Sequence, residues 1–317
     1  MEILVQIWSQ LLWPIIRIIA FVSLGLVVAN FIEALNWTRR LALLARPLIR
    51  FGNLSAITGA SFSMAFVSGV SANTMLAEAF DTGRITKKEL VLANLFNSLP
   101  RFFLHLPTVF FLTLPFIQGA ALHYVGVTFA AALLQTLLVV GAGSILLPPG
   151  DDDIPIDQST RTGWKEAAEK SLKRLKKRIP RIVKFLVPVY ALFFVLGHYG
   201  VFQYLEEIMA QSVLLGWLHP QSLSIVILHV TAEFSAGLAA ASVLLADNSL
   251  GYREVVLALL AGNILAAPVR AVRHQFPYYV GIFNPKLAAE LVGLSQVTRA
   301  GTVIAMGIVY YFVTVPA

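Results

Sequence analysis

Long apolar segments alternate with short polar ones along the chain. The hydrocarbon core of a bilayer is about 30 Å thick, so a helix that crosses it needs roughly 20 mainly apolar residues. Segments of that order recur at residues 11–35, 54–80, 89–117, 122–147, 182–202, 223–246, 254–281 and 287–315. This pattern predicts an all-α integral membrane protein.

Four of these segments have features that an ordinary spanning helix lacks. Segments 54–80 and 223–246 are rich in Gly, Ala and Ser, and we expect them to be re-entrant hairpins. Segments 89–117 and 254–281 contain prolines, which remove a backbone donor and interrupt a helix. We expect breaks at the prolines of these two segments, which are Pro100, Pro107, Pro115, Pro268 and Pro277.

The order of segments is the same in the two halves of the chain. Residues 1–147 and 182–317 each contain a span, a short amphipathic segment typical of an interfacial helix, a hairpin segment, a Pro-broken helix and a last span. Asn97 and Asn263 precede the expected break in each half. Three crossings per half is an odd number, so we expect inverted repeats, an architecture typical of transporters. Residues 148–181 would be the linker between them.

Composition agrees with a membrane protein, and the charge distribution predicts its orientation. Hydrophobic residues make up 57% of the chain and charged residues 13%, against roughly a quarter in soluble domains. The net charge is +7, and 10 of the 24 basic residues lie between Arg161 and Lys184. Because basic loops stay in the cytoplasm, we expect residues 148–184 inside and both termini outside the cell (inner) membrane. The basic stretch 164–181 favours anionic lipid headgroups as partners rather than nucleic acid.

Ionisable residues inside the apolar segments are the first candidates for function, because a charge at membrane depth is costly and normally has a partner or a role. Glu233 lies in the middle of the second hairpin segment, and His229 would share its helical face if the segment were helical there. They are candidates for a coupling-ion ligand or a proton relay; an ion pair of Glu233 with a nearby arginine is the alternative. Two such ligands do not make a metal site, and neither a metal nor a cofactor is predicted.

Arginines near the expected helix breaks suggest an anionic solute. Arg101, Arg270 and Arg273 would add to the partial positive charge of half-helix N-termini. The alternative is that they brace the two halves through backbone carbonyls freed by proline, or that they snorkel to the interface. The small polar residues expected to contact solute are Ser71, Asn73, Asn97, Ser235 and Asn263. Acidic residues at element ends, such as Glu89, are expected to cap helices or to be solvated at the membrane interface.

Three short motifs in the first half carry a resemblance to a known family. They are Ser71-Ala72-Asn73-Thr74, Gly83 before the helix that starts near Glu89, and Asn97-Ser98-Leu99-Pro100. This stretch resembles the Gate domain, or nucleoside-recognition domain, of concentrative nucleoside transporters, of the membrane part of ferrous iron transporter B and of spore maturation proteins. The resemblance implies the same order of interfacial helix, hairpin, broken helix and span, and a nucleoside-like solute.

These patterns predict a polytopic secondary transporter of a small polar solute, anionic or nucleoside-like, working by alternating access around a site at the membrane midplane. Enzyme activity is not expected, because the chain contains neither the HExxH nor the GxSxG motif. The alternative is a non-transporting membrane component of the spore maturation type, acting in morphogenesis or signalling. The sequence leaves a homo-oligomer open.

Overall fold

The computed structural model describes residues 46–66, 68–149 and 220–314, together with short stretches between residues 5 and 16 and single positions between residues 169 and 218. The following predicted elements therefore lie wholly or largely outside the described residues: the span at 11–35, the amphipathic segments at 36–50 and 203–219, the linker at 148–181 and the span at 182–202.

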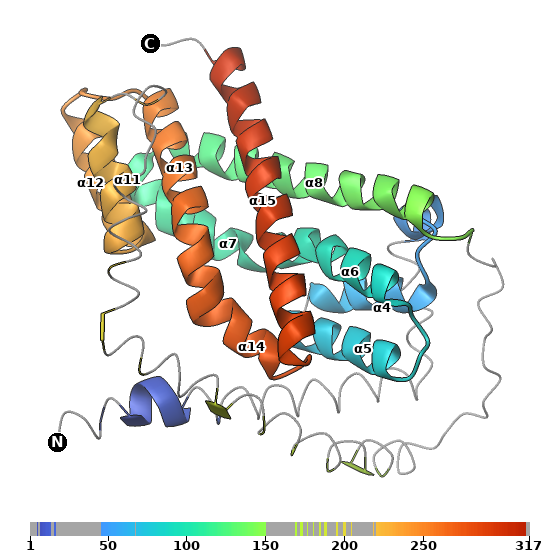
Figure 1. Cartoon of the computed structure of the whole chain (residues 1–317). Coiled ribbons are helices and arrows are strands. Elements are labelled where there is room, and N and C mark those ends of the chain that lie inside the picture. Colours follow the sequence, from blue (N-terminus) through green and yellow to red (C-terminus); the bar gives the residue numbers. More distant parts are fainter. Residues whose placement is uncertain are drawn as a thin grey trace. The chain divides into compact units, whose positions relative to one another are not determined.

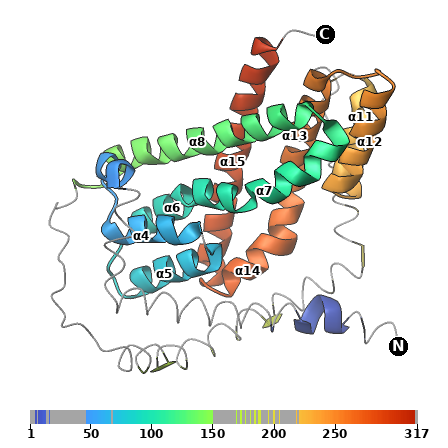
Figure 2. The same cartoon turned by 180° about the vertical axis from the view of Figure 1, so that it is seen from behind.

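Every element in the described part is a helix (Figures 1 and 2). In chain order they are η1 (Ile7–Leu12), α4 (Ala56–Ala65), α5 (Gly69–Asp81), α6 (Lys87–Phe96), α7 (Ser98–Ile117), α8 (Ala120–Leu146), η2 (Pro220–Ser222), α11 (Leu223–Thr231), α12 (Phe234–Ala246), α13 (Tyr252–Arg270), η3 (Ala271–Gln275), α14 (Phe276–Val280) and α15 (Pro285–Val313).

The chain forms two compact units, and each combines segments from both halves of the sequence. The first unit contains Met1–Leu104, Gln135–Phe194 and Phe276–Ser295. The second unit contains His105–Leu134, Val195–Gln275 and Gln296–Ala317. The inverted repeat of residues 1–147 and 182–317 stays a prediction.

The two Gly/Ala/Ser-rich segments each fold as a pair of short packed helices. In the first unit α4 packs against α5, and in the second α11 packs against α12 (Figure 1). These helices have between 9 and 13 residues. At about 1.5 Å per residue each is at most about 20 Å long, which is too short to cross a bilayer. Both segments are therefore helical hairpins, and their entry into the bilayer stays a prediction.

A carboxylate fixes the start of the first hairpin. Oε1 of Glu89, on α6, accepts hydrogen bonds from the backbone N–H of Ser55 and from Oγ1 of Thr58, both at 2.9 Å. Ser55 is the N-cap residue of α4 and also accepts from the N–H of Thr58. Glu89 therefore satisfies a donor that the helix start leaves free, as the capping prediction expects.

Three of the described helices are long and apolar enough to cross a membrane: Ala120–Leu146, Tyr252–Val280 and Pro285–Val313. Helices Ala120–Leu146 and Pro285–Val313 each have most of their apolar residues outside the buried interior of the protein. Large apolar side chains on them, such as Ile145 and Phe312, are at least three-quarters exposed. Burying this surface in lipid is favourable because hydrocarbon replaces water around it. The described helices thus indicate a membrane protein with apolar faces suited to bilayer contact.

The prolines of the first broken segment are not where the helix breaks. The interruption lies at Asn97, between α6 and α7, and α7 then continues to Ile117. Pro100 occupies the first turn of α7, where a missing N–H has no helical acceptor to lose. The predicted breaks at Pro107 and Pro115 are wrong, because one lost hydrogen bond does not end a helix when the rest of the ladder continues.

The second broken segment bends through a π-helical turn. Pro268 lies inside α13, and the π-helix η3 follows it at Ala271–Gln275. A proline leaves the carbonyl four residues earlier without its usual donor, and a wider turn is one way for a helix to absorb this. Pro277 lies inside α14 and does not end it. The segment is thus an irregular but continuous helix.

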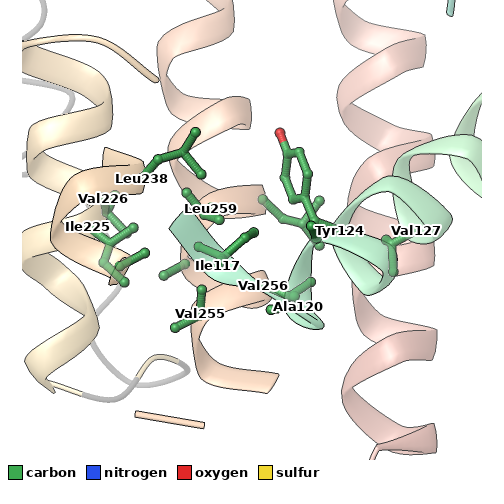
Figure 3. Close-up of a cluster of buried hydrophobic side chains, with 14 of the residues drawn as sticks. Ile117, Ala120, Tyr124, Val127, Ile225, Val226, Leu238, Val255, Val256 and Leu259 are labelled. Carbon is green, nitrogen blue, oxygen red and sulfur yellow. The ribbon is translucent and has the colours of Figure 1, made fainter. Parts of the chain in front are cut away.

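The second unit has an apolar core between its hairpin and the helices α7, α8 and α13. Figure 3 shows Val226 and Leu238 of the hairpin beside Leu259 of α13, with Ile117 and Tyr124 close by. All five side chains are at most 4% exposed. This core positions the hairpin against α13, which carries Asn263 and Arg270 near its C-terminal end.

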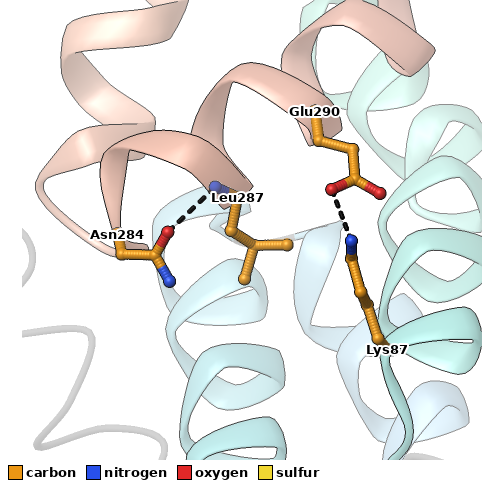
Figure 4. A network of polar contacts seen from close by, with 4 residues as sticks. All are labelled: Lys87, Asn284, Leu287 and Glu290. Atoms are coloured by element: carbon orange, nitrogen blue, oxygen red, sulfur yellow. Dashed lines mark hydrogen bonds and ion pairs between the residues drawn. The ribbon is translucent and has the colours of Figure 1, made fainter.

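In the first unit, a polar contact joins α15 to α6. Nζ of Lys87 forms an ion pair with Oε2 of Glu290 at 2.6 Å, and Oδ1 of Asn284 caps α15 by accepting from the N–H of Leu287 (Figure 4). The ion pair is partly exposed to solvent.

Candidate functional site

A buried network of amides and phenols lies in the first unit. Nδ2 of Asn94, on α6, donates to Oδ1 of Asn73, on α5, at 3.0 Å and to the hydroxyl of Tyr279, on α14, at 3.1 Å. Nδ2 of Asn73 donates to the hydroxyl of Tyr278 at 3.4 Å. Asn73, Asn94 and Tyr279 are at most 2% exposed. Their polar groups are satisfied by one another, as buried polar groups require.

Arg101 completes this network and is held on three sides. Its Nη2 donates to the backbone oxygen of Asn94 at 2.8 Å, and its Nε donates to the backbone oxygen of Asn97 at 3.0 Å. Its Nη1 donates to the hydroxyl of Tyr279 at 3.1 Å. All three acceptors are neutral, so Arg101 braces the end of α6. Arg101 thus has a bracing role, but its backbone acceptors are carbonyls at the end of α6 and not the carbonyl that Pro100 leaves without a donor.

Asn97 connects the helix break to the hairpin. Its Nδ2 donates to Oγ of Ser61 at 2.7 Å, and that hydroxyl donates to the backbone oxygen of Ala72 at 3.2 Å. Oδ1 of Asn97 is buried and has no hydrogen-bond partner within the described residues. Ser71 lies in the first turn of α5, where its N–H and hydroxyl both donate to Oγ of the capping residue Ser68. Asn97 is therefore a link between elements, and Ser71 belongs to a helix cap.

A second polar cluster lies in the second unit and is built around Asn263. Nη2 of Arg270 donates to the backbone oxygen of Asn263 at 3.0 Å and to its side-chain Oδ1 at 2.7 Å. Nη2 of Arg299, on α15, donates to the same Oδ1 at 3.2 Å. Nδ2 of Asn263 donates to the hydroxyl of Tyr124, on α8, at 3.2 Å. Two guanidinium groups thus converge on one neutral oxygen atom.

The two central arginines differ in how fully they are engaged. Arg101 uses all three kinds of guanidinium nitrogen in bonds to protein. In the described part of the chain, Arg270 uses only Nη2, and no acidic side chain forms an ion pair with it. Its Nε and Nη1 make no hydrogen bond within the described residues and could donate to a bound anion. Arg270 is therefore the better candidate for contact with an anion.

His229 is a buried group beside this cluster. It is 2% exposed, and neither ring nitrogen has a hydrogen-bond partner among the residues that the structure describes. Its ring lies 5.1 Å from that of Phe234, and a Cβ placed on Gly262 would lie 2.5 Å from its Nδ1. Burial lowers the pKa of His229 to about 3, and the positive charge of Arg270 acts in the same direction. His229 is therefore neutral near pH 7.

Glu233 does not share a helical face with His229, because α11 ends at Thr231. Glu233 is the exposed residue that precedes α12, with no side-chain capping bond. Ser235 is exposed in the first turn of α12, and Arg273 is exposed on η3. Among the described residues, no group of three or more His, Asp or Glu side chains could hold a metal ion.

The two clusters share one bonding pattern. Arg101 and Arg270 each donate to the backbone oxygen of the asparagine seven residues earlier, Asn94 and Asn263. The side chain of each of these asparagines also donates to a tyrosine hydroxyl. In its contacts Asn263 therefore resembles Asn94 more than Asn97.

Sequence reasoning missed several members of the two clusters. Asn94, Tyr124 and Tyr279 lie in apolar segments without a distinctive motif. The spacing of seven residues between asparagine and arginine in both halves is a signal that could have identified Asn94. No comparable signal exists for the tyrosines, because Tyr124 and Tyr279 are 139 and 185 residues away from the asparagines that they contact.

Comparison with known proteins gives relatives but no family. Uncharacterized protein MJ0871 of Methanocaldococcus jannaschii is 25% identical over 278 residues, which cover 87% of both chains. Uncharacterized protein MJ1556 of the same organism is 25% identical over 285 residues, 89% of both chains, and uncharacterized protein MJ0880 is 23% identical over 278 residues, 84% of this chain and 88% of that one. No family model and no solved structure matches the chain. The similarity thus extends over most of each chain.

Proposed function

We propose that the chain is a polytopic secondary transporter that moves a small polar solute with an anionic group across the cell membrane by alternating access. The observation that carries the proposal is the convergence of Arg270 and Arg299 on Oδ1 of Asn263. Arg270 belongs to the candidate span Tyr252–Val280, and Arg299 belongs to the candidate span Pro285–Val313.

Physical chemistry supports an anionic partner for these arginines. A charge within a membrane span is costly and is normally kept because it has a partner or a function. Asn263 offers each guanidinium a neutral oxygen, whereas an anion adds Coulomb attraction and can accept two parallel N–H bonds from one guanidinium. A carboxylate or phosphate on the solute would supply a negative charge to Arg270, which has no ion pair with an acidic side chain in the described part of the chain. Arg101 already has three neutral acceptors, so we assign it a structural role.

The helical architecture supports transport as the use of this site. One hairpin of short helices in each half, an interrupted helix in the first half and an irregular helix in the second are compatible with an inverted-repeat transporter with a Gate-like fold. The recurring bond from arginine to the asparagine seven residues earlier favours an internal repeat. The proposal keeps residues 148–184 in the cytoplasm and both termini outside.

Uptake into proteoliposomes tests the proposal. Purified protein is reconstituted with an imposed proton or sodium gradient and offered labelled dicarboxylates, nucleoside monophosphates and uncharged nucleosides. We expect uptake of an anionic solute that is lost in Arg270→Gln and kept in Arg84→Gln, which removes an exposed arginine outside the cluster. Uptake of nucleosides alone that is unaffected by Arg270→Gln, or no gradient-driven uptake of any solute class, would contradict it. The second result would favour a non-transporting membrane component.

A further inference from the structure

Oδ1 of Asn263 occupies the point on which two cations converge. Nη2 of Arg270 lies 2.7 Å from it, and Nη2 of Arg299 lies 3.2 Å from it. We propose that Asn263 is a built-in stand-in for the anion: its carboxamide oxygen holds the place of an oxygen of a bound carboxylate or phosphate and is displaced when the anion binds. This inference rests on the anionic site of the proposed function and adds a specific role for Asn263.

The shape and charge of the carboxamide support this role. A carboxamide has the planar shape of a carboxylate but carries no net charge, so it satisfies the geometry of the guanidinium groups without balancing their charge. An oxyanion forms stronger bonds with the same donors. The stand-in is therefore strong enough to keep Arg270 in place and weak enough to be replaced.

Asn263 also connects the arginine pair to the hairpin of the second unit. Its Nδ2 donates to the hydroxyl of Tyr124, whose ring is stacked with that of Phe234 at 5.8 Å and 26°. Phe234 is the first residue of α12. Displacement of Oδ1 therefore changes the position of an amide that contacts the hairpin through Tyr124. Anion binding at Asn263 can therefore alter the position of the hairpin through the contact of Tyr124 with Phe234.

The equivalent asparagine of the first unit provides a natural control. Oδ1 of Asn94 accepts from the hydroxyl of Tyr279 at 3.3 Å, and Arg101 contacts only the backbone oxygen of Asn94. Nδ2 of Asn94 donates to both Asn73 and Tyr279. Asn94→Asp would lose these donated bonds and would not place its carboxylate in contact with an arginine side chain. Asn263→Asp would place its carboxylate in contact with the guanidinium groups of both Arg270 and Arg299.

Thermal unfolding of the purified full-length protein in detergent, followed by tryptophan fluorescence, tests the role of Asn263. Sodium phosphate and sodium acetate are titrated separately against sodium chloride of equal ionic strength, so that phosphate and carboxylate are distinguished from simple screening. We expect an oxyanion to raise the Tm of the wild type more than chloride does. Asn263→Asp should have a raised Tm without oxyanion and show no further rise with it, because its carboxylate already occupies the site.

Two further variants complete the test. Asn263→Ala removes the competing oxygen, so the oxyanion concentration that gives half of the Tm rise should fall about tenfold, as expected for the loss of roughly one hydrogen bond of competition. Asn94→Asp should lower the Tm and keep the oxyanion response. The proposal is overturned if Asn263→Asp lowers the Tm as Asn94→Asp does, or if it keeps the full oxyanion response of the wild type.

Failure of transport and failure of this inference give different results. If Asn263→Asp is stabilised and insensitive to oxyanions while wild-type proteoliposomes take up no anion, the stand-in role holds and the transporter assignment fails. If uptake depends on Arg270 while Asn263→Asp behaves as the wild type does in the thermal assay, transport holds and the stand-in role is overturned.

Discussion

Nη2 of Arg270 donates to the backbone oxygen of Asn263, seven residues earlier on the same irregular helix, at 3.0 Å. Arg101 makes the same bond to Asn94 in the other compact unit, at 2.8 Å. The shared bond holds Arg270 along its own helix and holds Arg101, on α7, against the end of the preceding helix α6. The remaining guanidinium nitrogens distinguish the two arginines. Those of Arg101 are engaged by protein, whereas Nε and Nη1 of Arg270 make no hydrogen bond within the described residues.

This difference predicts opposite phenotypes for the two arginines. Arg101→Gln removes charged hydrogen bonds to three neutral acceptors, each worth about 1.5–3 kcal/mol, and should lower the Tm strongly. Arg270→Gln should lower the Tm less and abolish the Tm rise caused by oxyanions. Thermal unfolding with and without sodium phosphate or acetate measures both effects. An Arg101→Gln protein that keeps its Tm and loses only the oxyanion response would reverse the assignment.

Close packing at Gly262 gives a prediction about the second hairpin. A Cβ at this position would lie 2.5 Å from Nδ1 and 2.8 Å from Cγ of His229, so Gly262→Ala must displace α11 or the imidazole ring. We expect a loss of about 1–3 kcal/mol of stability, as for other overpacked cores. Gly301→Ala is the matched control, because its Cβ would meet no atom within 4 Å. Equal Tm values for the two variants would show that the hairpin does not pack on α13 in this way.

The capping role of Glu89 predicts a graded loss of stability. Glu89→Ala removes the acceptor for the Ser55 N–H and the Thr58 hydroxyl and should cost about 2–4 kcal/mol, whereas Glu89→Gln keeps an acceptor oxygen and should cost less. Glu290→Gln, which breaks the partly exposed pair with Lys87, should cost about 1 kcal/mol or less. Chemical or thermal unfolding gives the order, and a larger loss for Glu290→Gln than for Glu89→Ala would refute it.

His229 predicts a pH dependence of stability. Its pKa falls from 6.5 to about 3 on folding, so between these values the unfolded chain binds a proton that the folded chain does not. Stability from this group is therefore complete above about pH 6.5 and is lost as the pH falls toward 3. Between pH 7.5 and pH 5 the Tm of the wild type should fall relative to that of His229→Leu. Parallel Tm curves would show that His229 is not buried as described.

The sequence predicted the apolar segments well because their length and composition are strong signals. The predicted segments at 122–147 and 287–315 correspond to α8 and α15 within two residues at each end. The hairpin segment 223–246 corresponds to η2, α11 and α12 within three residues at its start. Apolar length is a local property, so it needs no knowledge of the partners of a segment.

The site was harder to predict because its contacts join distant segments. Asn263 and Arg270 could be named from one segment, but the hydroxyl of Tyr124 that binds Asn263 lies on α8. The positions of the prolines were a poor guide to the helix breaks, because a single proline removes only one backbone hydrogen bond. The break in the first half lies at Asn97. Glu233 and His229 do not share a helical face because α11 ends at Thr231, and no local pattern in the sequence marks that end.

Counterflow in proteoliposomes tests the central claim most directly. Vesicles are loaded with an unlabelled oxyanion that raises the Tm of the protein and are diluted into a trace of the same anion carrying a label. A carrier that alternates access around Arg270 should accumulate label transiently in wild-type vesicles and in Arg84→Gln vesicles, and not in Arg270→Gln vesicles. Label that enters wild-type and Arg270→Gln vesicles to the same extent as protein-free vesicles would contradict the assignment as an anion carrier.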